Sequence, residues 1–355
     1  MQRAERGNQT LITEFILLGF GNGPELQPLL FLFFLASYIV TVAGNILIIV
    51  LVVSDPHLHT PMYYLLCNLA CVETCYSSIF LPRLLVSLVT GVRTISVKGC
   101  IVQLYFFGIM SNTESLLLTA MSFDRYIAIC HPLRYTVLMS GKICSQLVAL
   151  SFLCSLLSCT ILNIFFFQLT FCGSNEIDHY FCDFSPVIKV SCSDTRILQL
   201  VTYVVASLGT LVPCLLTLVS YIYIISTILR IPSSIRRQKA FSTCSTHLIV
   251  ITVFYGAVIA VYMVPTANMP KVLHKIFSLY YIVLTPLINP IIYCLRNKEI
   301  NKSLRKAFLK KRIANGCRYA PGGMSTKTVR KRFVAQGITL CDASNDQVGN
   351  TLRRK

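Results

Sequence analysis

Five long runs without a charged residue constrain this chain more than any other feature. Each is at least as long as the roughly 20 apolar residues that cross the hydrocarbon core of a bilayer as a helix. The runs are residues 26–54, 143–175, 197–229, 240–270 and 276–295, which span 29, 33, 33, 31 and 20 residues. Only 13% of all residues are charged, against about a quarter in a soluble domain. These runs exclude a soluble, disordered or nucleic-acid-binding protein and predict an integral membrane protein.

Two further apolar stretches are interrupted by single charges. In Met62–Leu85 the charges are Glu73 and Arg83, and in Gly99–Phe123 the charge is Glu114. Because a helix satisfies its own backbone in lipid, such spans are helical, and the alternating strands of a β-barrel are not seen. The seven predicted spans are 29–53, 61–85, 99–130, 143–167, 198–229, 240–263 and 276–295. The expected fold is an all-α membrane protein, a seven-transmembrane helix bundle over residues 28–295.

The distribution of Lys and Arg predicts which side of the membrane each connection occupies. The connections after odd-numbered spans, together with residues 296–355, carry 23 basic residues, and the other side carries 8. When only 296–315 of the C-terminal segment is counted, the ratio is still 15 to 8. We expect a plasma-membrane protein with a cytoplasmic C-terminus and an extracellular N-terminal segment, residues 1–27. The sequon at Asn8 would then be a glycosylation site.

The segment 1–27 lacks the features of a cleavable signal peptide, because Glu14 interrupts its apolar stretch. The C-terminal segment 296–355 holds 16 basic and 3 acidic residues and so contributes +13 of the net charge of +18. Within it, residues 296–312 are predicted to form a short amphipathic helix on the anionic inner leaflet. Residues 313–355 are predicted to be a basic, disordered cytoplasmic tail.

Four of the sixteen cysteines fall on the predicted outer side: Cys100, Cys172, Cys182 and Cys192. An even number of cysteines in an oxidising compartment indicates disulfide bonds. Four cysteines allow three pairings, and the residues alone leave all three open.

Two motifs at the predicted inner ends of spans carry a family resemblance. The third span ends with Asp124-Arg125-Tyr126, and the last span contains Asn289-Pro290 followed by Tyr293. Seven spans with these motifs resemble the rhodopsin-like G-protein-coupled receptors. Three further segments narrow the resemblance to the vertebrate odorant receptors over residues 8–310: Pro61-Met62-Tyr63, the stretch KAFSTCSTHL at 239–248, and the cysteine-rich outer loop.

Several absences support the narrower resemblance. The chain has no tryptophan and carries Phe254-Tyr255-Gly256 in the sixth span, as odorant receptors do. A visual pigment would have a lysine in 276–295, and an amine receptor would have an acid where Phe107 and Gly108 stand. Glu73 replaces the more usual Asp, and Ile288 the more usual Leu, which are conservative departures.

Small and polar residues recur along one face of the third span. The stripe is Gly108, Ser111, Asn112, Ser115, Thr119 and Ser122. Small residues also allow close helix packing, and this reading suits the inner half of the span. The outer half could line an apolar cavity with a few polar groups. The resemblance implies odorant binding there, by Phe107, Gly108, Ser111, Asn112, Val205, Tyr255, Val258, Ile259 and Tyr262. Since none of these is ionisable, we expect a small, neutral, apolar ligand.

Glu73 and Glu114 are acids within apolar spans, where an exposed charge costs about 2.5–3.5 kcal/mol. They should face the interior. The resemblance implies that they approach one another at a structural Na⁺ site, and two close carboxylates would either hold a cation or share a proton. No other metal or cofactor is expected.

The resemblance also implies roles for the coupling residues at the inner ends of the spans and for the outer cysteines. Arg125 would be held by Asp124 at rest and released to meet a G protein. The other coupling and activation residues would be Tyr126, Tyr221, Lys239, Asn289, Pro290 and Tyr293. The implied disulfides are Cys100–Cys182, which tethers the outer loop over the pocket, and Cys172–Cys192 within that loop.

The predicted function is that of an odorant receptor that activates a stimulatory G protein and raises cyclic AMP, without being an enzyme. Its partners would be an odorant, a heterotrimeric G protein and membrane lipid, and no nucleic acid. A rhodopsin-like receptor for a non-odorant ligand is an alternative. A secondary transporter is disfavoured because spans 1–3 and 4–6 show no repeat. For an intramembrane enzyme, only Glu73 and Glu114 would be available as catalytic acids.

Overall fold

A computed structural model describes residues 12–20, 25–172, 174–263, 270–297 and 299–308. The predicted glycosylation site at Asn8 and the predicted disordered tail lie outside the described residues. The side chains of Lys239 and Tyr262 lie outside them as well. Residues 1–300 form one compact unit and 301–355 a second.

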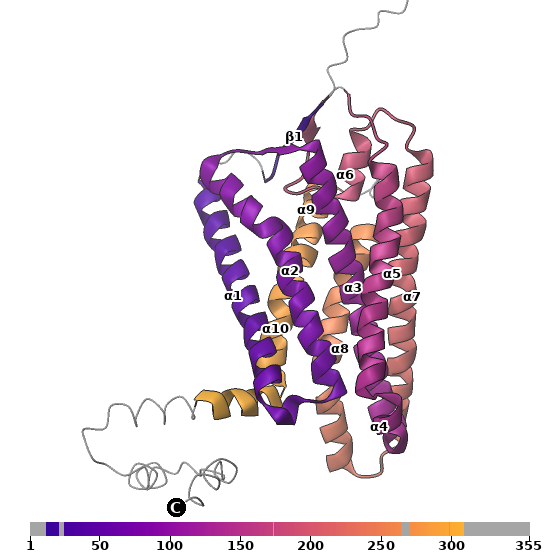
Figure 1. Cartoon of the computed structure of the whole chain (residues 1–355). Coiled ribbons are helices and arrows are strands. Elements are labelled where there is room, and N and C mark those ends of the chain that lie inside the picture. Colours follow the sequence, from indigo (N-terminus) through magenta and orange to yellow (C-terminus); the bar gives the residue numbers. More distant parts are fainter. Residues whose placement is uncertain (1–11, 21–24, 173, 264–269, 298, 309–355) are drawn as a thin grey trace, which may run out of the picture. The chain divides into compact units, whose positions relative to one another are not determined.

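The first unit is a bundle of long helices, shown in Figure 1. Five of them are α1 (Leu26–Ser54), α2 (Pro61–Thr90), α3 (Val97–Cys130), α5 (Gly141–Phe166) and α7 (Arg196–Leu229). The sixth span consists of α8 (Ser234–Val258) and a π-helical turn, Ile259–Met263. The seventh consists of α9 (Lys271–Leu279), a second π-helical turn (Tyr280–Leu284) and α10 (Thr285–Arg296). The seven predicted spans all correspond to these segments. Each start or end differs from its prediction by at most six residues.

Short elements complete the connections. They are the 3₁₀ turns Pro56–Leu58 and Pro132–Arg134, α4 (Tyr135–Leu138) and α6 (Phe184–Lys189). Helix ends follow ordinary capping chemistry: Ser96 Oγ accepts from Gly99 N at 3.1 Å at the start of α3, and α2 ends at Gly91 with φ +72°. Residues 299–308 are helical within the predicted amphipathic segment, and Asn297 Oδ1 accepts from the backbone N of Glu299 at 3.1 Å.

Six described segments are long and apolar enough to span a membrane, and α3 is not among them. Its 34 residues are long enough, but Glu114, Asp124 and a series of Ser and Thr side chains lower its hydropathy. It contacts α2, α5, α7 and α8, so protein rather than lipid surrounds much of it. The polar residues are tolerated because they are buried among other helices.

A proline in α7 shows how such polar residues are used. Pro213 has no N–H, so the carbonyl of Gly209 one turn earlier loses its helical donor. Ser115 Oγ of α3 donates to that carbonyl at 3.3 Å. Thr119 Oγ1, one turn further along α3, donates to the carbonyl of Pro213 at 3.2 Å. The hydroxyl stripe of α3 therefore satisfies backbone groups of α7 within the bundle.

A small three-stranded sheet at one end of the bundle was not anticipated. β1 (Glu14–Leu17) lies between β2 (Thr94–Ser96), to which it is antiparallel, and β3 (Glu176–Ile177), to which it is parallel. Beneath it a buried cluster includes Phe15, Phe171 and Cys100. We call this end of the bundle the sheet end.

Both disulfides lie at the sheet end. Cys100 pairs with Cys182 at a Cα–Cα distance of 5.6 Å, and Cys172 pairs with Cys192 at 5.9 Å. These are the two pairs that the resemblance implies. The first joins the start of α3 to the loop between α5 and α7.

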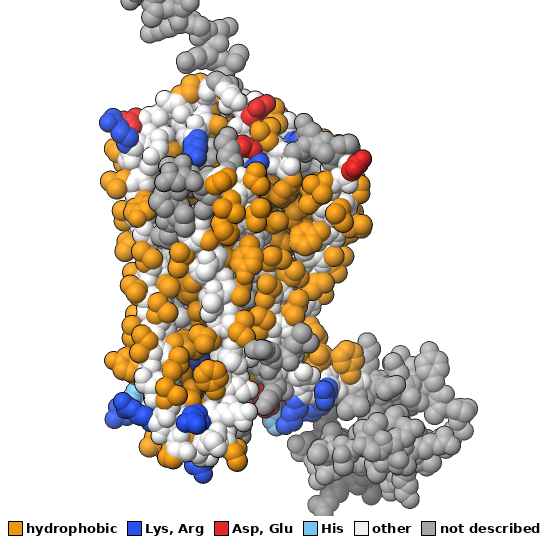
Figure 2. All heavy atoms as spheres, turned by 180° about the vertical axis from the view of Figure 1, so that it is seen from behind, with side chains coloured by type: hydrophobic (Ala, Val, Ile, Leu, Met, Phe, Trp, Pro, Cys, Tyr) orange, Lys and Arg blue, Asp and Glu red, His pale blue; other side chains and the backbone are white. Residues whose placement is uncertain are grey.

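The surface of the bundle is apolar around its middle. Figure 2 shows hydrophobic side chains over the middle of the molecule and charged side chains at its two ends. Leu200, Leu215 and Ile222 of α7 are 63%, 60% and 62% exposed. A soluble protein does not leave such a continuous apolar surface uncovered, whereas a membrane supplies the lipid that covers it. The chain is a multi-pass membrane protein.

Candidate functional site

The loop that Cys182 tethers reaches directly into the bundle. Phe181, next to the disulfide, packs on Phe107 of α3 with ring centroids 5.5 Å apart. Phe107 also packs on Tyr76 of α2 at 5.2 Å and on Tyr281 of the seventh span at 6.4 Å. Phe107 is 2% exposed. The disulfide therefore positions an aromatic side chain of the loop against a predicted ligand-binding residue.

Hydroxyl groups connect α3 to the sixth and seventh spans below this aromatic cluster. The Ser111 and Tyr281 hydroxyls are hydrogen-bonded to each other. The Tyr255 hydroxyl of α8 lies 3.3 Å from Ser115 Oγ and 3.2 Å from Thr119 Oγ1. We call Phe107, Ser111, Ser115, Tyr255 and Tyr281 the interior layer. Three separate spans meet in it, so a molecule bound there would contact all three.

Gly108 and Asn112 serve close packing of α3 against its neighbours. A Cβ added at Gly108 would lie 3.0 Å from Cys159 Sγ of α5. Asn112 Nδ2 donates to the same sulfur at 3.7 Å, and Asn112 Oδ1 would lie 2.6 Å from a Cβ added at Gly209 of α7. These two predicted pocket residues thus lie on the side of α3 that faces α5 and α7.

Two of the predicted ligand-binding residues of the sixth span, Tyr255 and Val258, lie in the last turn of α8. The α-helix ends there, and Ile259 begins a π-helical turn. Tyr255 and Val258 are 4% and 5% exposed, whereas Ile259 is 37% exposed. Val205 of α7 is half-buried.

Three buried Ser and Thr hydroxyls in the halves of α7 and of the seventh span toward the sheet end have no hydrogen-bond partner among the described residues. They belong to Thr202 and Ser207 of α7 and to Ser278 of α9. A buried hydroxyl without a partner costs free energy, so these groups are available to a polar atom of a ligand. The sequence analysis missed all three because Ser and Thr are common in spans and carry no distinguishing spacing.

Glu73 and Glu114 are both 1% exposed. Asn289 Nδ2 of α10 donates to Glu73 Oε1 at 2.5 Å, and Asn45 of α1 also lies within reach of that carboxyl group. Glu114 is close enough to Glu73 for the two groups to interact electrostatically. Among the described residues, Glu114 Oε1 and Asn289 Oδ1 are buried without a hydrogen-bond partner. Side-chain oxygen atoms of Glu73 in α2, Glu114 in α3 and Asn289 in α10 therefore lie near one another.

At the end opposite the sheet, Asp124 is fully buried and holds Arg125. Arg125 Nε and Nη2 donate to Asp124 Oδ2 at 2.9 and 2.5 Å. The Tyr135 hydroxyl of α4 donates to Asp124 Oδ1 at 2.8 Å. Burial, and then the carboxylate of Asp124, raise the pKa of Tyr135. The role of Tyr135 was not predicted, because the sequence does not show that α4 folds back onto the Asp-Arg-Tyr motif.

The other predicted coupling residues differ in which helices they contact. Tyr221 and Tyr293 are 4% and 1% exposed, and the Tyr221 hydroxyl lies 2.8 Å from His247 Nδ1 of α8. Tyr126 instead lies toward α7, where its ring is 5.9 Å from that of Tyr223. Pro290 packs so closely on α1 that its Cβ would lie 2.8 Å from a Cβ added at Gly44.

A cavity of about 350 Å³ lies beside this cluster. Its lining residues come from one end of α8: Gln238, Phe241, Ser242, Ser245 and Thr246. All of these except Gln238 belong to the stretch 239–248, whose sequence narrowed the resemblance. Four of these five lining side chains are polar, and Phe241 is apolar.

Comparison with known proteins decides the family. The sequence profile of the olfactory receptors matches residues 34–311. Olfactory receptor 1E16 of Mus musculus is 44% identical over 306 residues, which are 86% of this chain and 98% of the relative. Olfactory receptor 2AP1 of Homo sapiens is 43% identical over 298 residues, 84% of this chain and 96% of the relative. This chain belongs to the olfactory receptor family.

Olfactory receptors are odorant-sensing G-protein-coupled receptors, so this chain is a receptor and not an enzyme. In this olfactory receptor Phe107 and Ser111 contact Tyr281, which was not among the predicted residues, and Tyr255 contacts Ser115. The structure separates Gly108 and Asn112, which pack on α5 and α7, from the interior layer. No sequence signal distinguishes Tyr281 from Tyr280 beside it, and its partner Ser111 lies on another helix.

Proposed function

We propose that this olfactory receptor binds a small, neutral, apolar odorant with one or two polar atoms at the interior layer. Binding would favour an active arrangement of the helices. That arrangement would activate a stimulatory G protein and so raise cyclic AMP. The sheet end would face the outside of the plasma membrane, and the end that carries Arg125 would face the cytosol. The excess of Lys and Arg on the Arg125 side and the disulfides at the sheet end support this orientation.

The observation that carries the proposal is the convergence of three spans at the interior layer. Ser111 and Ser115 of α3 bond to Tyr281 of the seventh span and to Tyr255 of α8. The hydroxyls of Thr202, Ser207 and Ser278 supply further polar groups. Because these groups are neutral, a neutral ligand is the better match. A charged ligand would lose its hydration without gaining a partner.

The same contacts support a route from the interior layer to the opposite end. Tyr255 lies on α8, and about two turns earlier in α8 is His247, bonded to Tyr221 of α7. A ligand that changes the contacts of Tyr255 would favour one position of α8 over another. Its differential affinity for the two arrangements would set the population shift. Arg125, released from Asp124, would then be available to the G protein.

We further propose that Glu73, Glu114 and Asn289 hold a sodium ion. The two buried oxygen atoms without a partner, Glu114 Oε1 and Asn289 Oδ1, fit a small hard cation, which prefers oxygen ligands. A bound cation would offset the negative charge of the two carboxyl groups. The alternative is a proton shared between them. A Glu114→Gln receptor that keeps the sodium sensitivity of the unchanged protein would favour the proton.

The test is cyclic AMP accumulation in cells that express the receptor and are exposed to a panel of volatile compounds. We expect at least one active compound, no response in Arg125→Ala, and a retained response in the control Arg134→Ala, which alters an arginine outside the Asp124 contact. Surface expression is measured in parallel. A normal response in Arg125→Ala would contradict the coupling role.

A second pair of variants tests the ligand site. Ser111→Ala removes the bond to Tyr281, and Tyr262→Ala alters the neighbouring turn. We expect the concentration for half-maximal response to rise at least tenfold for Ser111→Ala. Unchanged responses of both variants to every active compound, at equal surface expression, would show that the odorant binds elsewhere.

A further inference from the structure

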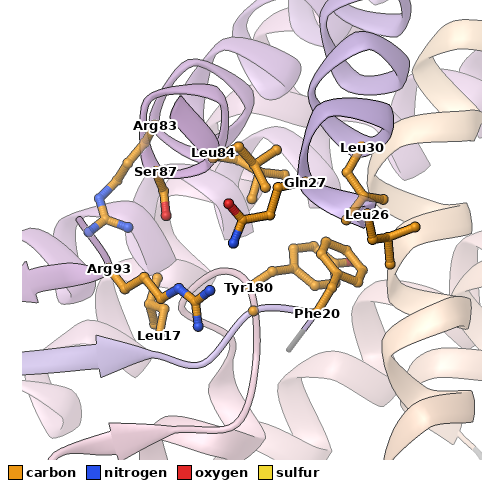
Figure 3. Close-up of a pocket in the computed structure, with 12 residues that line it drawn as sticks. Leu17, Phe20, Leu26, Gln27, Leu30, Arg83, Leu84, Ser87, Arg93 and Tyr180 are labelled. Atoms are coloured by element: carbon orange, nitrogen blue, oxygen red, sulfur yellow. The ribbon is translucent and has the colours of Figure 1, made fainter. Parts of the chain in front are cut away.

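A small cavity at the sheet end lies away from the interior layer, between the first strand, α1 and α2 (Figure 3). Its volume is about 40 Å³. One water molecule needs roughly 10–15 Å³ measured in this way, so the cavity is large enough for a carboxylate-sized group. Neither the odorant site nor the coupling residues use it.

Two arginines line this cavity. Arg83 comes from α2, and Arg93 comes from the turn before β2. Figure 3 shows the Arg93 guanidinium and the Gln27 amide directed toward the middle of the cavity. Arg83 Nη2 donates to Thr94 O at 2.5 Å, and Arg93 Nη1 donates to Leu18 O at 3.3 Å. The other side chains that line the cavity are uncharged.

Arg83 is half-buried and has no acidic partner among the described residues. The ion pairs found there join Asp124 to Arg125, Asp178 to Lys275 and Asp194 to Arg196. A guanidinium has five N–H donors in a planar fork that matches a carboxylate or a phosphate. One backbone carbonyl leaves most of the donors of Arg83 for another acceptor. These donors could bind an oxyanion that enters the cavity.

The remaining walls are apolar. Leu26 and Leu30 come from α1, and Leu84 and Leu88 come from α2. Leu26 is 46% exposed, so it lies at the surface of the protein as well as at the cavity. On the other side, Phe20 and Tyr180 stack with ring centroids 4.8 Å apart. An anionic head beside the arginines could therefore continue into an alkyl chain between α1 and α2.

We propose that this cavity binds the oxyanion head of a molecule with an alkyl chain. The molecule is either a free fatty acid or an anionic lipid of the surrounding leaflet, since carboxylate and phosphate share the chemistry that a guanidinium recognises. The bound head joins β1 and β2, through Leu18 and Thr94, to α1 and α2. The proposal does not depend on the proposed odorant or G protein.

The first experiment measures thermal unfolding of the purified full chain in neutral detergent. Decanoate at ten times its dissociation constant should raise the unfolding midpoint by about 3 °C. Decanol, which has the same chain without the charge, should raise it by less than about 1 °C, because it offers no oxyanion. Equal shifts with decanoate and decanol would overturn the proposal.

Nanodiscs distinguish the two sources of the oxyanion. If lipid supplies it, phosphatidic acid in phosphatidylcholine nanodiscs raises the midpoint and decanoate adds nothing further. If a free fatty acid supplies it, decanoate acts in both nanodiscs and phosphatidic acid has no effect. A midpoint that neither phosphatidic acid nor decanoate changes would refute an oxyanion site.

Substitutions locate the site. Gln27→Glu places a carboxylate on the cavity wall, so it should raise the midpoint without ligand and remove the decanoate effect. The matched control Gln199→Glu introduces the same charge on α7 outside the cavity and should keep the full effect. Arg83→Gln should weaken decanoate binding at least tenfold. A Gln27→Glu variant that responds to decanoate like the unchanged receptor would rule the site out, even if Arg83→Gln fails to fold.

Discussion

α3 and α7 have the same length, 34 residues, and use it in opposite ways. α3 buries Glu114, Asp124 and several hydroxyl side chains among four neighbouring helices. α7 leaves most of its long apolar side chains exposed, Leu215 and Ile222 among them. In this bundle, polar rather than apolar side chains therefore identify the inward side of a helix. A leucine is about as stable in lipid as in the protein interior, whereas a carboxyl group in lipid costs free energy.

The inward side of α7 nevertheless forms a regular stripe. Its buried residues from the middle to the far end are Thr210, Pro213, Thr217, Tyr221, Ile224 and Ile228. The spacings are three or four residues, so these side chains share one helical face. The stripe meets the hydroxyls of α3, including Thr119, which lies 3.3 Å from Thr217 Oγ1. Both helices thus place hydroxyls where they meet, and only α7 has a broad face left for lipid.

The largest expected effect comes from the same truncation on the two helices. Leu118 of α3 is 0% exposed and Leu215 of α7 is 60% exposed. Leu118→Ala should lower the free energy of unfolding by about 2–5 kcal/mol, because it leaves a cavity. Leu215→Ala should change it by less than about 0.5 kcal/mol, because lipid fills the space. Thermal unfolding of the purified variants measures both, and equal losses would break the comparison.

A smaller effect is expected where the two helices approach most closely. Gly209→Ala would place a Cβ 2.6 Å from Asn112 Oδ1. Displacing that side chain from its site against α5 should cost about 1–3 kcal/mol. Gly256→Ala in α8 is the control, since nothing lies within 4 Å of its Cβ position. The control should be as stable as the unchanged receptor or slightly more so. A Gly209→Ala receptor as stable as the Gly256→Ala control would show that α3 and α7 are not closely packed at Gly209.

The hydroxyl contacts between α3 and α8 should contribute less. Tyr255→Phe and Thr119→Val each remove one side of the 3.2 Å contact. Each should lower the free energy of unfolding by about 1 kcal/mol. In a double-mutant cycle the two single losses should sum to more than the loss in the double variant, because the 3.2 Å contact is removed in both. Fully additive losses would show that the contact contributes nothing. Basal cyclic AMP, measured in the same variants, reports whether the contact restrains α8.

The smallest effect is expected just before α7, outside the bundle. Hydrogen bonds from the Arg196 side chain and backbone hold the pKa of Asp194 below its ordinary value. A lowered pKa in the folded state adds stability that is present above the unfolded value, near 4, and is lost as the pH falls through the folded value. Both side chains are exposed, at 62% and 88%.

Because solvent screens this pair, Asp194→Asn should shift the unfolding midpoint at pH 7 by less than about 1 °C. The small difference from the unchanged receptor should disappear on acidification below the folded pKa. A shift as large as that of Leu118→Ala would show that an exposed charge pair can rival core packing here.

The seven spans could be predicted because a run without charge has few alternatives to a membrane helix. The pairing of the four outer cysteines was different. The residues alone left three pairings, and the resemblance to a family implied one of them. The small sheet was not predicted, since β3 is only two residues long and pairs with a strand more than 150 residues away. Such pairing depends on the loop around Cys182, not on local propensity.

The candidate site could be predicted in part. The helical spacing of α3 correctly suggested that Phe107 and Ser111 are internal, but it could not show that Gly108 and Asn112 face α5 and α7. Ile259, a predicted ligand residue, is 37% exposed and lies in a π turn that the sequence did not reveal. Tyr281 and Tyr135 were missed because their partners, Ser111 and Asp124, lie on a different element.

The sequence by itself determined that this protein crosses a membrane seven times and to which family it belongs, because charge, apolar length and short motifs are local properties of the chain. Only the tertiary structure decided which side of α3 each neighbour occupies, which hydroxyls bond across helices, and which carboxyl and guanidinium groups are enclosed. Those outcomes depend on distances between residues far apart in the chain, and a helix with polar residues on several sides does not specify them.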